Sequence, residues 1–356
     1  MENVLYYYTT AETMRYILTK GDIFASHINY LNDSEEYVNG LRELRELDLS
    51  GRFTGYSNNK NYNSDAYSQM LKSTPEIFSI SFSKEADLLS QWYMYARESG
   101  VRLGMLFPKK NQEFQIKLKT PDGKMRTTES VLKDVRYFTR IGMTPQEYRS
   151  ETEAVIKMIE DYIREKGIEN KLDENWALIW RDIAPYIKNY EFRQEKEVRL
   201  IFYASIETGE GAGPDLIEYR NANGVLVPYL DIYRKEGWPV VEIMVGPGRN
   251  QGRVFSSICH FIENNFLKIP EIDQKESMKA FIKGMSSYQV EHEKIEEYCE
   301  KIEKDVSKKE EFITYKDRIY DILDKGTPHE REYLDRNYYS NCGIIVRKSN
   351  APYEFS

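Results

Sequence analysis

The stretch YEFRQEKEVRLIF, residues 190–202, is the part of the sequence on which the fold prediction depends. From Glu197 onward, charged and apolar residues alternate before the chain becomes wholly apolar, which predicts a β-strand at Glu197–Tyr203. A period of two places Glu195, Glu197 and Arg199 on one face of this strand. Two interpretations of the charged face are open: a solvated sheet edge with ion pairs between neighbouring strands, or a site that uses the carboxylates.

The elements on either side of this stretch mix strands and helices without the strict alternation of a doubly wound parallel sheet. The predicted strands are residues 4–8, 23–25, 77–82, 101–107, 197–203, 224–230, 240–245 and 342–347. The predicted helices are residues 11–19, 35–47, 87–97, 150–166 and 174–187, with another after Gly246-Pro247-Gly248, and residues 54–69 are expected to form a loop. This order indicates an α+β fold around a mixed, strongly twisted sheet with flanking helices.

The composition of the chain changes toward its C-terminus. From Pro270 to about Lys325 it is rich in charged residues and poor in strand-like runs, which predicts a helical insertion. We therefore expect an α+β domain at residues 1–268, a charged helical insertion at residues 269–338, and a C-terminal strand within residues 339–356 that returns to the main domain.

The composition also argues against several classes of protein. The 356 residues carry a net charge of −8 and contain no apolar run near the roughly 18 residues of a membrane span. Because the first residues lack a secretory signal, we expect a cytoplasmic protein with no membrane partner. The 3 cysteines and 4 histidines show neither disulfide nor zinc spacing, so no metal is expected. Neither a phosphate-binding loop nor a hydrolase nucleophile motif is present.

Three further segments carry residue types that a binding site could use. Tyr8 and Thr9 lie in an aromatic strand, where packing in the core is the competing explanation. Ser81 and Ser83 share one face of a predicted strand, and serine is unusual on a face that packs against apolar core. That face is therefore either wet or part of a site. Asn32 precedes a predicted helix, so it could cap the helix or order a loop over a ligand.

Taken in chain order, these segments resemble the bacterial family DUF2971. The motifs are Tyr6-x-Tyr8-Thr9-Thr10, Leu31-Asn32-Asp33-x-x-Glu36, Phe82-Ser83 followed by Gln91-Trp92-x-x-Tyr95, Lys188-x-x-x-Phe192-x-x-Glu195-x-Glu197-x-Arg199-Leu200, Ile243-x-Val245-Gly246-Pro247, and Val346-x-x-Ser349-x-x-Pro352-Tyr353. The resemblance covers most of the chain outside residues 270–338. That family is in turn similar to the ADP-ribosyltransferase fold, whose members split NAD and transfer ADP-ribose.

The resemblance implies a site made of three blocks from distant parts of the chain. In order, the blocks are Tyr8 with Thr9, Ser81 with Ser83, and Glu195 with Glu197. Two departures from the family's pattern stand out: the first block has no His or Arg, and the middle strand reads Ser-Phe-Ser where Ser-Thr-Ser is commoner. Trp92 and Tyr95 would then either wall the pocket or pack beneath it.

The implied chemistry is cleavage of the bond between nicotinamide and ribose. This cleavage develops positive charge on the sugar, which a nearby carboxylate stabilises. Glu197 would stabilise that charge and hold a ribose hydroxyl, and Glu195 would position or deprotonate the acceptor. Arg199 would bind the pyrophosphate or form an internal ion pair.

The resemblance thus implies an NAD-dependent ADP-ribosyltransferase of the toxin or phage-defence kind. NAD would be a substrate, and the acceptor would be a macromolecule, either protein or nucleic acid. An antitoxin or chaperone partner would be expected to restrain the enzyme. One basic cluster, around Lys117 and Lys119, is either a solvated hairpin or a local contact for nucleic acid. The alternatives are a catalytically degenerate module that binds a partner, and an NAD hydrolase that uses water as acceptor.

Overall fold

A computed structural model describes most of the chain and divides it into two compact units. The described residues are 3–31, 35–49, 76–96, 100–107, 114–120, 123–139, 142–168, 172–204, 216–222, 224–234, 237–266, 273–307, 315–323 and 325–351. The first unit comprises Met1–Gly21, Lys84–Lys109 and Arg234–Ser356, and the second comprises Asp22–Ser83 and Lys110–Tyr233. Each unit combines helices with strands, which confirms the α+β prediction.

The first unit contains a mixed sheet with the strand order β14-β15-β13-β4-β1. Its strands are β1 (Asn3–Thr10), β4 (Gly100–Phe107), β13 (Val240–Val245), β14 (Asn337–Tyr339) and β15 (Ile345–Lys348). β1 runs antiparallel to β4, whereas β15 runs parallel to β13. The C-terminal strand therefore returns to the sheet that holds the N-terminal strand, as the sequence predicts.

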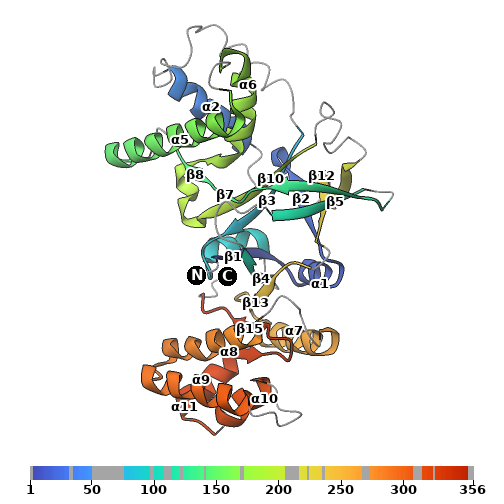
Figure 1. The fold of residues 1–356 in the computed structure, drawn as a ribbon, viewed down its shortest axis with the longest axis vertical. Coiled ribbons are helices and arrows are strands. Elements are labelled where there is room, and N and C mark those ends of the chain that lie inside the picture. Colours follow the sequence, from blue (N-terminus) through green and yellow to red (C-terminus); the bar gives the residue numbers. More distant parts are fainter. Residues whose placement is uncertain are drawn as a thin grey trace. The chain divides into compact units, whose positions relative to one another are not determined.

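The first unit also contains several helices in addition to this sheet. They are α1 (Ala11–Lys20), α4 (Leu89–Gln91), a π-helix η2 (Trp92–Ala96), α7 (Gln251–Asn265), α8 (Gln274–Lys283), a 3-10 helix η7 (Gly284–Tyr288), α9 (His292–Ser307), α10 (Tyr315–Leu323) and α11 (Pro328–Arg336). The helices α8 to α11 lie together beside β15 in Figure 1 and surround an apolar core that includes Phe281, Ile302 and Tyr333. The charged segment is thus helical as predicted. The helix predicted at residues 87–97 is instead a single α-helical turn followed by the π-helix.

The second unit contains an antiparallel sheet in the order β10-β3-β2-β12-β5-β6, with β7 beside β10 and β11 beside β12. Its strands are β2 (Asp22–His27), β3 (Ile77–Ser83), β5 (Phe114–Lys119), β6 (Met125–Ser130), β7 (Lys133–Asp134), β10 (Glu197–Tyr203), β11 (Glu218–Ala222) and β12 (Val225–Tyr233). Two further strands, β8 (Arg136–Tyr137) and β9 (Ile187–Lys188), form a separate parallel pair. The strand predicted at Glu197–Tyr203 is confirmed at both ends.

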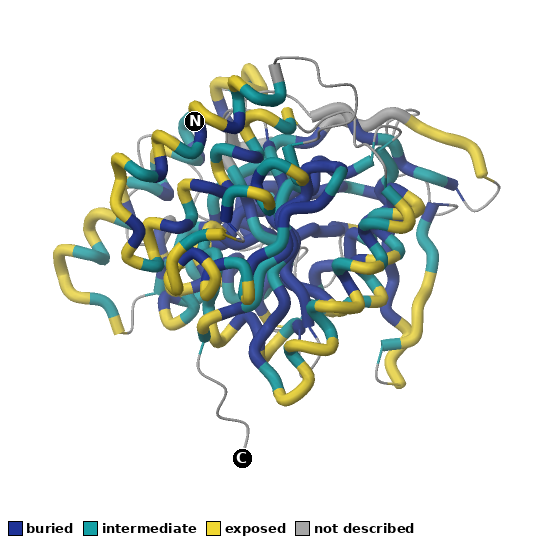
Figure 2. The backbone as a smooth tube through the Cα atoms, turned by 90° about the horizontal axis from the view of Figure 1, so that it is seen from below, coloured by how far each residue is buried: buried dark blue, intermediate teal, exposed yellow. Residues whose placement is uncertain are grey.

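Helices of the second unit build an apolar core of their own. They are η1 (Ile28–Tyr30), α2 (Glu36–Leu49), α5 (Pro145–Lys166), α6 (Leu172–Ile183) and the 3-10 helices η4 (Ala184–Tyr186) and η5 (Tyr190–Glu195). The helices α2, α5 and α6 gather on one side of this unit (Figure 1) and bury Leu41, Trp176 and Trp180. Along the helices, buried residues alternate with exposed ones within each turn, as expected of amphipathic segments (Figure 2). The predicted helix 174–187 ends early because Pro185 opens a 3-10 turn.

The helices and strands described above do not test every prediction made from the sequence. The loop predicted at residues 54–69 lies outside the described residues. The domain boundaries at residues 268 and 338 stay predictions, although α8 to α11 belong to the same compact unit as β14 and β15. Among the described residues, no helix is both long and apolar enough to cross a membrane.

Candidate functional site

The second and third sequence blocks meet on two neighbouring strands of the second unit. β10 pairs antiparallel with β3, so that Glu197 lies opposite Ser83 and Arg199 lies opposite Ser81. The Ser83 hydroxyl donates to the backbone carbonyl of Glu195, with an O to O distance of 2.6 Å. Four of the predicted site residues, together with Glu195, are therefore neighbours within one compact unit.

Five charged side chains form a buried cluster at this place, which we call the carboxylate cluster. Its members are Glu36, Lys188, Glu195, Glu197 and Arg199, and each is at most 6% exposed. The Lys188 ammonium nitrogen lies 2.7 Å from Glu195 Oε2, 3.0 Å from Glu197 Oε2 and 3.6 Å from Glu36 Oε2. Because all these charges are buried, the solvated sheet edge that the sequence left open is wrong.

Arg199, on β10, is the second cation of the carboxylate cluster and binds two of its carboxyl groups. Its Nε donates to Glu197 Oε1 at 2.6 Å, and its Nη2 donates to Glu197 Oε2 at 2.9 Å. Nη2 also pairs with the Glu36 carboxylate, and Nη1 donates to the backbone oxygen of Pro185 at 2.5 Å. Of the two roles considered for Arg199, the structure shows the internal ion pair.

Local backbone geometry brings Glu195 into the cluster by a route that the sequence pattern missed. Glu195 is the last residue of the 3-10 helix η5 and not a strand residue. The next residue, Lys196, has a left-handed backbone with φ 42°, which turns the chain sharply before β10 begins at Glu197. Glu195 and Glu197 therefore reach the same ammonium group from different elements and do not share one strand face.

The two carboxyl groups bonded to Lys188 have opposite protonation tendencies. Burial opposes ionisation of Glu197, but the charges of Arg199 and Lys188 outweigh it and lower its pKa to about 2. Burial raises the pKa of Glu195 above its ordinary value, and the Lys188 charge compensates only in part. Glu195 Oε1 is buried and accepts no hydrogen bond. At neutral pH, Glu197 is thus ionised, while burial makes Glu195 hold a proton more readily than Glu197 does.

The charge count of the carboxylate cluster agrees with this difference. Three carboxyl groups face two cations, so a fully ionised cluster would bury one negative charge without a counter-ion. Burying an unpaired charge is costly, and a proton on one carboxyl removes that cost. Burial disfavours the Lys188 ammonium, but Glu197 and Glu36 raise its pKa, so it stays charged. Burial acts in the same direction on Glu195, because it raises the pKa of that carboxyl group.

The first sequence block lies in the other compact unit, on β1. Tyr8 is 6% exposed; its hydroxyl donates to the Glu85 carbonyl at 2.9 Å and accepts from the Leu88 amide at 3.1 Å. Burial raises the pKa of Tyr8 to about 12, and its ring meets Trp92 edge-on at 4.8 Å. Thr9 is 7% exposed. Tyr8 and Trp92 therefore contribute to the packing of the first unit.

The convergence of all three blocks stays a prediction. Tyr8 and Thr9 belong to the first unit and the carboxylate cluster to the second, whereas Asn32 lies outside the described residues. Trp92 is fully buried and donates from Nε1 to Asp87 Oδ1 at 2.7 Å, which supports packing as its role.

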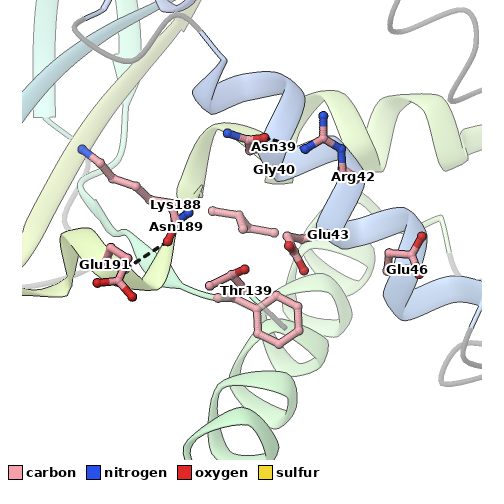
Figure 3. A pocket seen from close by; sticks show the side chains of 11 residues that line it. Asn39, Gly40, Arg42, Glu43, Glu46, Thr139, Lys188, Asn189 and Glu191 are labelled. Atoms are coloured by element: carbon pink, nitrogen blue, oxygen red, sulfur yellow. Dashed lines mark hydrogen bonds between the residues drawn. The ribbon is translucent and has the colours of Figure 1, made fainter. Parts of the chain in front are cut away.

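A pocket of about 550 Å³ lies beside the carboxylate cluster, in the second unit. It is lined by residues of α2, by Phe138 and Thr139, and by Ile187, Lys188, Asn189 and Glu191 (Figure 3). Lys188 belongs to both features, because it is one of the residues that line the pocket and its ammonium group reaches the carboxylates. A pocket of this size is large enough for a small ligand or for side chains of a partner.

Sequence reasoning left Glu36 and Lys188 out of the predicted site, although both belong to the quoted motifs. Glu36 begins α2, so a role in the first turn of the helix explained it locally. Lys188 stands in the two-residue strand β9, which has no sequence signal of its own. Lys188 directly follows the buried residues Tyr186 and Ile187, and a charge that is buried beside them requires a partner.

Within the described part of the chain, no group of three or more His, Cys, Asp or Glu is arranged to hold a metal ion. Comparisons with family models, with curated proteins and with solved structures found no match to this chain. The carboxylate cluster and the pocket are therefore the features from which we infer a function.

Proposed function

We propose that this chain is an NAD-dependent ADP-ribosyltransferase that cleaves the bond between nicotinamide and ribose. The observation that carries the proposal is a pair of buried carboxyl groups, Glu195 and Glu197, with opposite protonation tendencies. Because Glu195 Oε2 and Glu197 Oε2 both lie within 3.0 Å of Lys188 Nζ, they are within about 6 Å of each other.

The two carboxyl groups suit the two charges that the reaction produces. Loss of nicotinamide leaves a cationic sugar, and an ionised Glu197 stabilises that cation electrostatically. The attacking acceptor must lose a proton, and Glu195 can take it because its pKa lies closer to neutrality than that of an ordinary glutamate. Pairs of titratable groups whose environments drive their pKa values apart are typical of acid and base roles in active sites.

The finer assignments from the sequence belong to the same proposal. The chain would have the ADP-ribosyltransferase fold of the DUF2971 family, and Ser81, Ser83, Tyr8, Thr9 and Asn32 would contact NAD. The hydrogen bond of Ser81 to Glu197 supports a place for Ser81 beside the sugar. A toxin or phage-defence role, with a macromolecular acceptor and a restraining partner, follows from the resemblance alone.

Release of nicotinamide from NAD, with bacterial lysate supplying the acceptor, tests this proposal directly. We expect Glu197→Gln to slow release by about 10²-fold or more, as loss of one transition-state contact does. Glu195→Gln retains the shape of the protonated carboxyl, so we expect it to fold normally while slowing transfer to the acceptor. Glu153→Gln, on the exposed face of α5, removes the same charge and should leave the rate unchanged.

A folding check on each variant and an analysis of the reaction products complete the test. Circular dichroism shows whether each variant is folded, and if Glu197→Gln fails to fold, Glu195→Gln carries the test. Absence of release by the wild-type protein in every lysate, or equal release by all variants, would contradict the proposal. Free ADP-ribose as the only product would show an NAD hydrolase, whereas a labelled macromolecule would show a transferase.

A different observation supports a second candidate function, a binding module without catalysis. Both oxygens of Glu197 are occupied by Arg199 and Lys188, so the carboxylate is already neutralised inside the protein. Tyr8, in the first block where the enzymes that the sequence resembles carry His, Arg or Tyr, is likewise engaged in packing. A folded protein that releases no nicotinamide but retains a partner in the cell would favour this candidate.

A further inference from the structure

The pocket beside the carboxylate cluster has a lining whose chemistry points to one class of ligand. Figure 3 shows α2 on one side and the chain around Asn189 and Glu191 on the other. Ile187 and Phe138 supply apolar surface, and Phe138 is held in place by stacking on Tyr148 at 5.1 Å. The pocket thus offers an apolar surface within a charged rim.

The rim of the pocket is predominantly acidic. Glu43, Glu46 and Glu191 line it, and the first two stand one helical turn apart on α2. Arg42 is the exposed cation of the lining, and its guanidinium donates to Asn39 Oδ1 at 3.0 Å. Glu43 takes part in another interaction, so the carboxyl groups of Glu46 and Glu191, beside the Arg42 guanidinium, carry the acidic character of the rim.

The second cation of the lining contributes little positive charge to this space. Lys188 is 5% exposed, and its ammonium group bonds Glu195 and Glu197 (2.7 and 3.0 Å). In Figure 3 its side chain extends away from the pocket. A phosphate-rich ligand would meet net repulsion here, whereas a cation on an apolar stem would meet attraction at the rim and apolar contact below it.

We propose that this pocket docks a lysine- or arginine-bearing segment of a protein. Long basic side chains match the lining, because their methylene stems suit Ile187 and Phe138 while their charges suit Glu46 and Glu191. The pocket adjoins the carboxylate cluster through Lys188. If the proposed function holds, the docked segment therefore belongs to the acceptor, which is then a protein and not a nucleic acid.

Binding of short labelled probes tests the docking proposal without any catalytic readout. The probes are a ten-residue peptide of alternating Lys and Ala, a matching peptide of Glu and Ala, and a ten-nucleotide single-stranded DNA, followed by fluorescence anisotropy at low salt. We expect the Lys peptide to bind most tightly. The double variant Glu46→Gln with Glu191→Gln should weaken that binding by about 2- to 5-fold for each charge removed, as single exposed charge pairs do.

A charge-matched control separates the pocket from the general acidity of the chain. The double variant Glu12→Gln with Glu300→Gln removes two exposed carboxylates in the first unit, so it should leave peptide binding unchanged. Equal loss in both double variants, absence of peptide binding, or tighter binding of the DNA would overturn the proposal. Because Glu197→Gln lies outside the pocket lining, peptide binding by that variant, if folded, would show that docking stands even where NAD cleavage fails.

Discussion

Replacing Lys188 with methionine removes the ammonium group on which the carboxylate cluster converges. At an effective dielectric constant of about 20, each of its two close contacts, at 2.7 and 3.0 Å, contributes roughly 6 kcal/mol before desolvation is counted. Returning the ammonium to water recovers several kcal/mol of that sum. We therefore expect Lys188→Met to lower the free energy of unfolding by about 3–5 kcal/mol, the usual cost of breaking a buried ion pair from one side.

The loss should depend on pH in a predictable direction. Without Lys188, three carboxyl groups face only Arg199, so their pKa values in the folded state rise above those in the unfolded chain. Groups of that kind destabilise the folded state progressively as pH increases, because the unfolded chain gives up its protons first. The difference in stability between the variant and the wild-type protein should therefore be small near pH 5 and large near pH 8.

Urea unfolding followed by tryptophan fluorescence measures this difference, since Trp176 and Trp180 lie in the core of the same unit. Lys188→Arg keeps the charge and should recover part of the stability, and Lys20→Met, at an exposed site, controls for loss of a lysine. A loss below about 0.5 kcal/mol near pH 8, or a loss independent of pH, would refute the reasoning.

Two further predictions concern other parts of the molecule. Burial and the neighbouring Asp22 raise the pKa of Asp231 to about 7, so its ionisation destabilises the folded state as pH rises from about 4 to about 7. Asp231→Asn should remove this pH dependence and gain about 1–2 kcal/mol near pH 8 in urea unfolding, and an unchanged slope would contradict it. Gly246→Ala would place a Cβ 2.7 Å from the Trp92 ring and should destabilise by about 1–3 kcal/mol in thermal unfolding. Gly252→Ala, where a Cβ meets nothing within 4 Å, should be neutral or stabilising, and equal melting of the two variants would contradict the clash.

The sequence predicted the bounds of the strands in the site better than it predicted the contacts between the site's side chains. Apolar alternation is a local property, so β3 and β10 could be placed within one residue from their own composition. Their pairing register, with Arg199 opposite Ser81, depends on the folded sheet and has no local signal. The same holds for the ion pair between Glu36 and Arg199, which are 163 residues apart.

Local rules also explain the elements that the sequence misplaced. A strict period of two assigned Glu195 to the strand, but a left-handed residue at Lys196 breaks the period. Apolar residues at helical spacing predicted a regular helix around Trp92, whereas the structure has a π-helix there. Both deviations lie in segments that the sequence had marked as candidate sites, and irregular backbone is common where a protein holds functional side chains in place.

The carboxylate cluster is hard to explain by stability alone, and one double variant tests this. Replacing a buried ion pair with apolar side chains of similar size is often neutral or stabilising. Lys188→Met combined with Glu195→Leu removes one cation and one anion together, so we expect it to regain about 0.5–3 kcal/mol relative to Lys188→Met alone. If the charges serve only the fold, the double variant should bind its partners as the wild-type protein does. If Glu195 serves chemistry, the restored fold should still fail to modify an acceptor, and a double variant with wild-type transfer would rule out a catalytic role for Glu195.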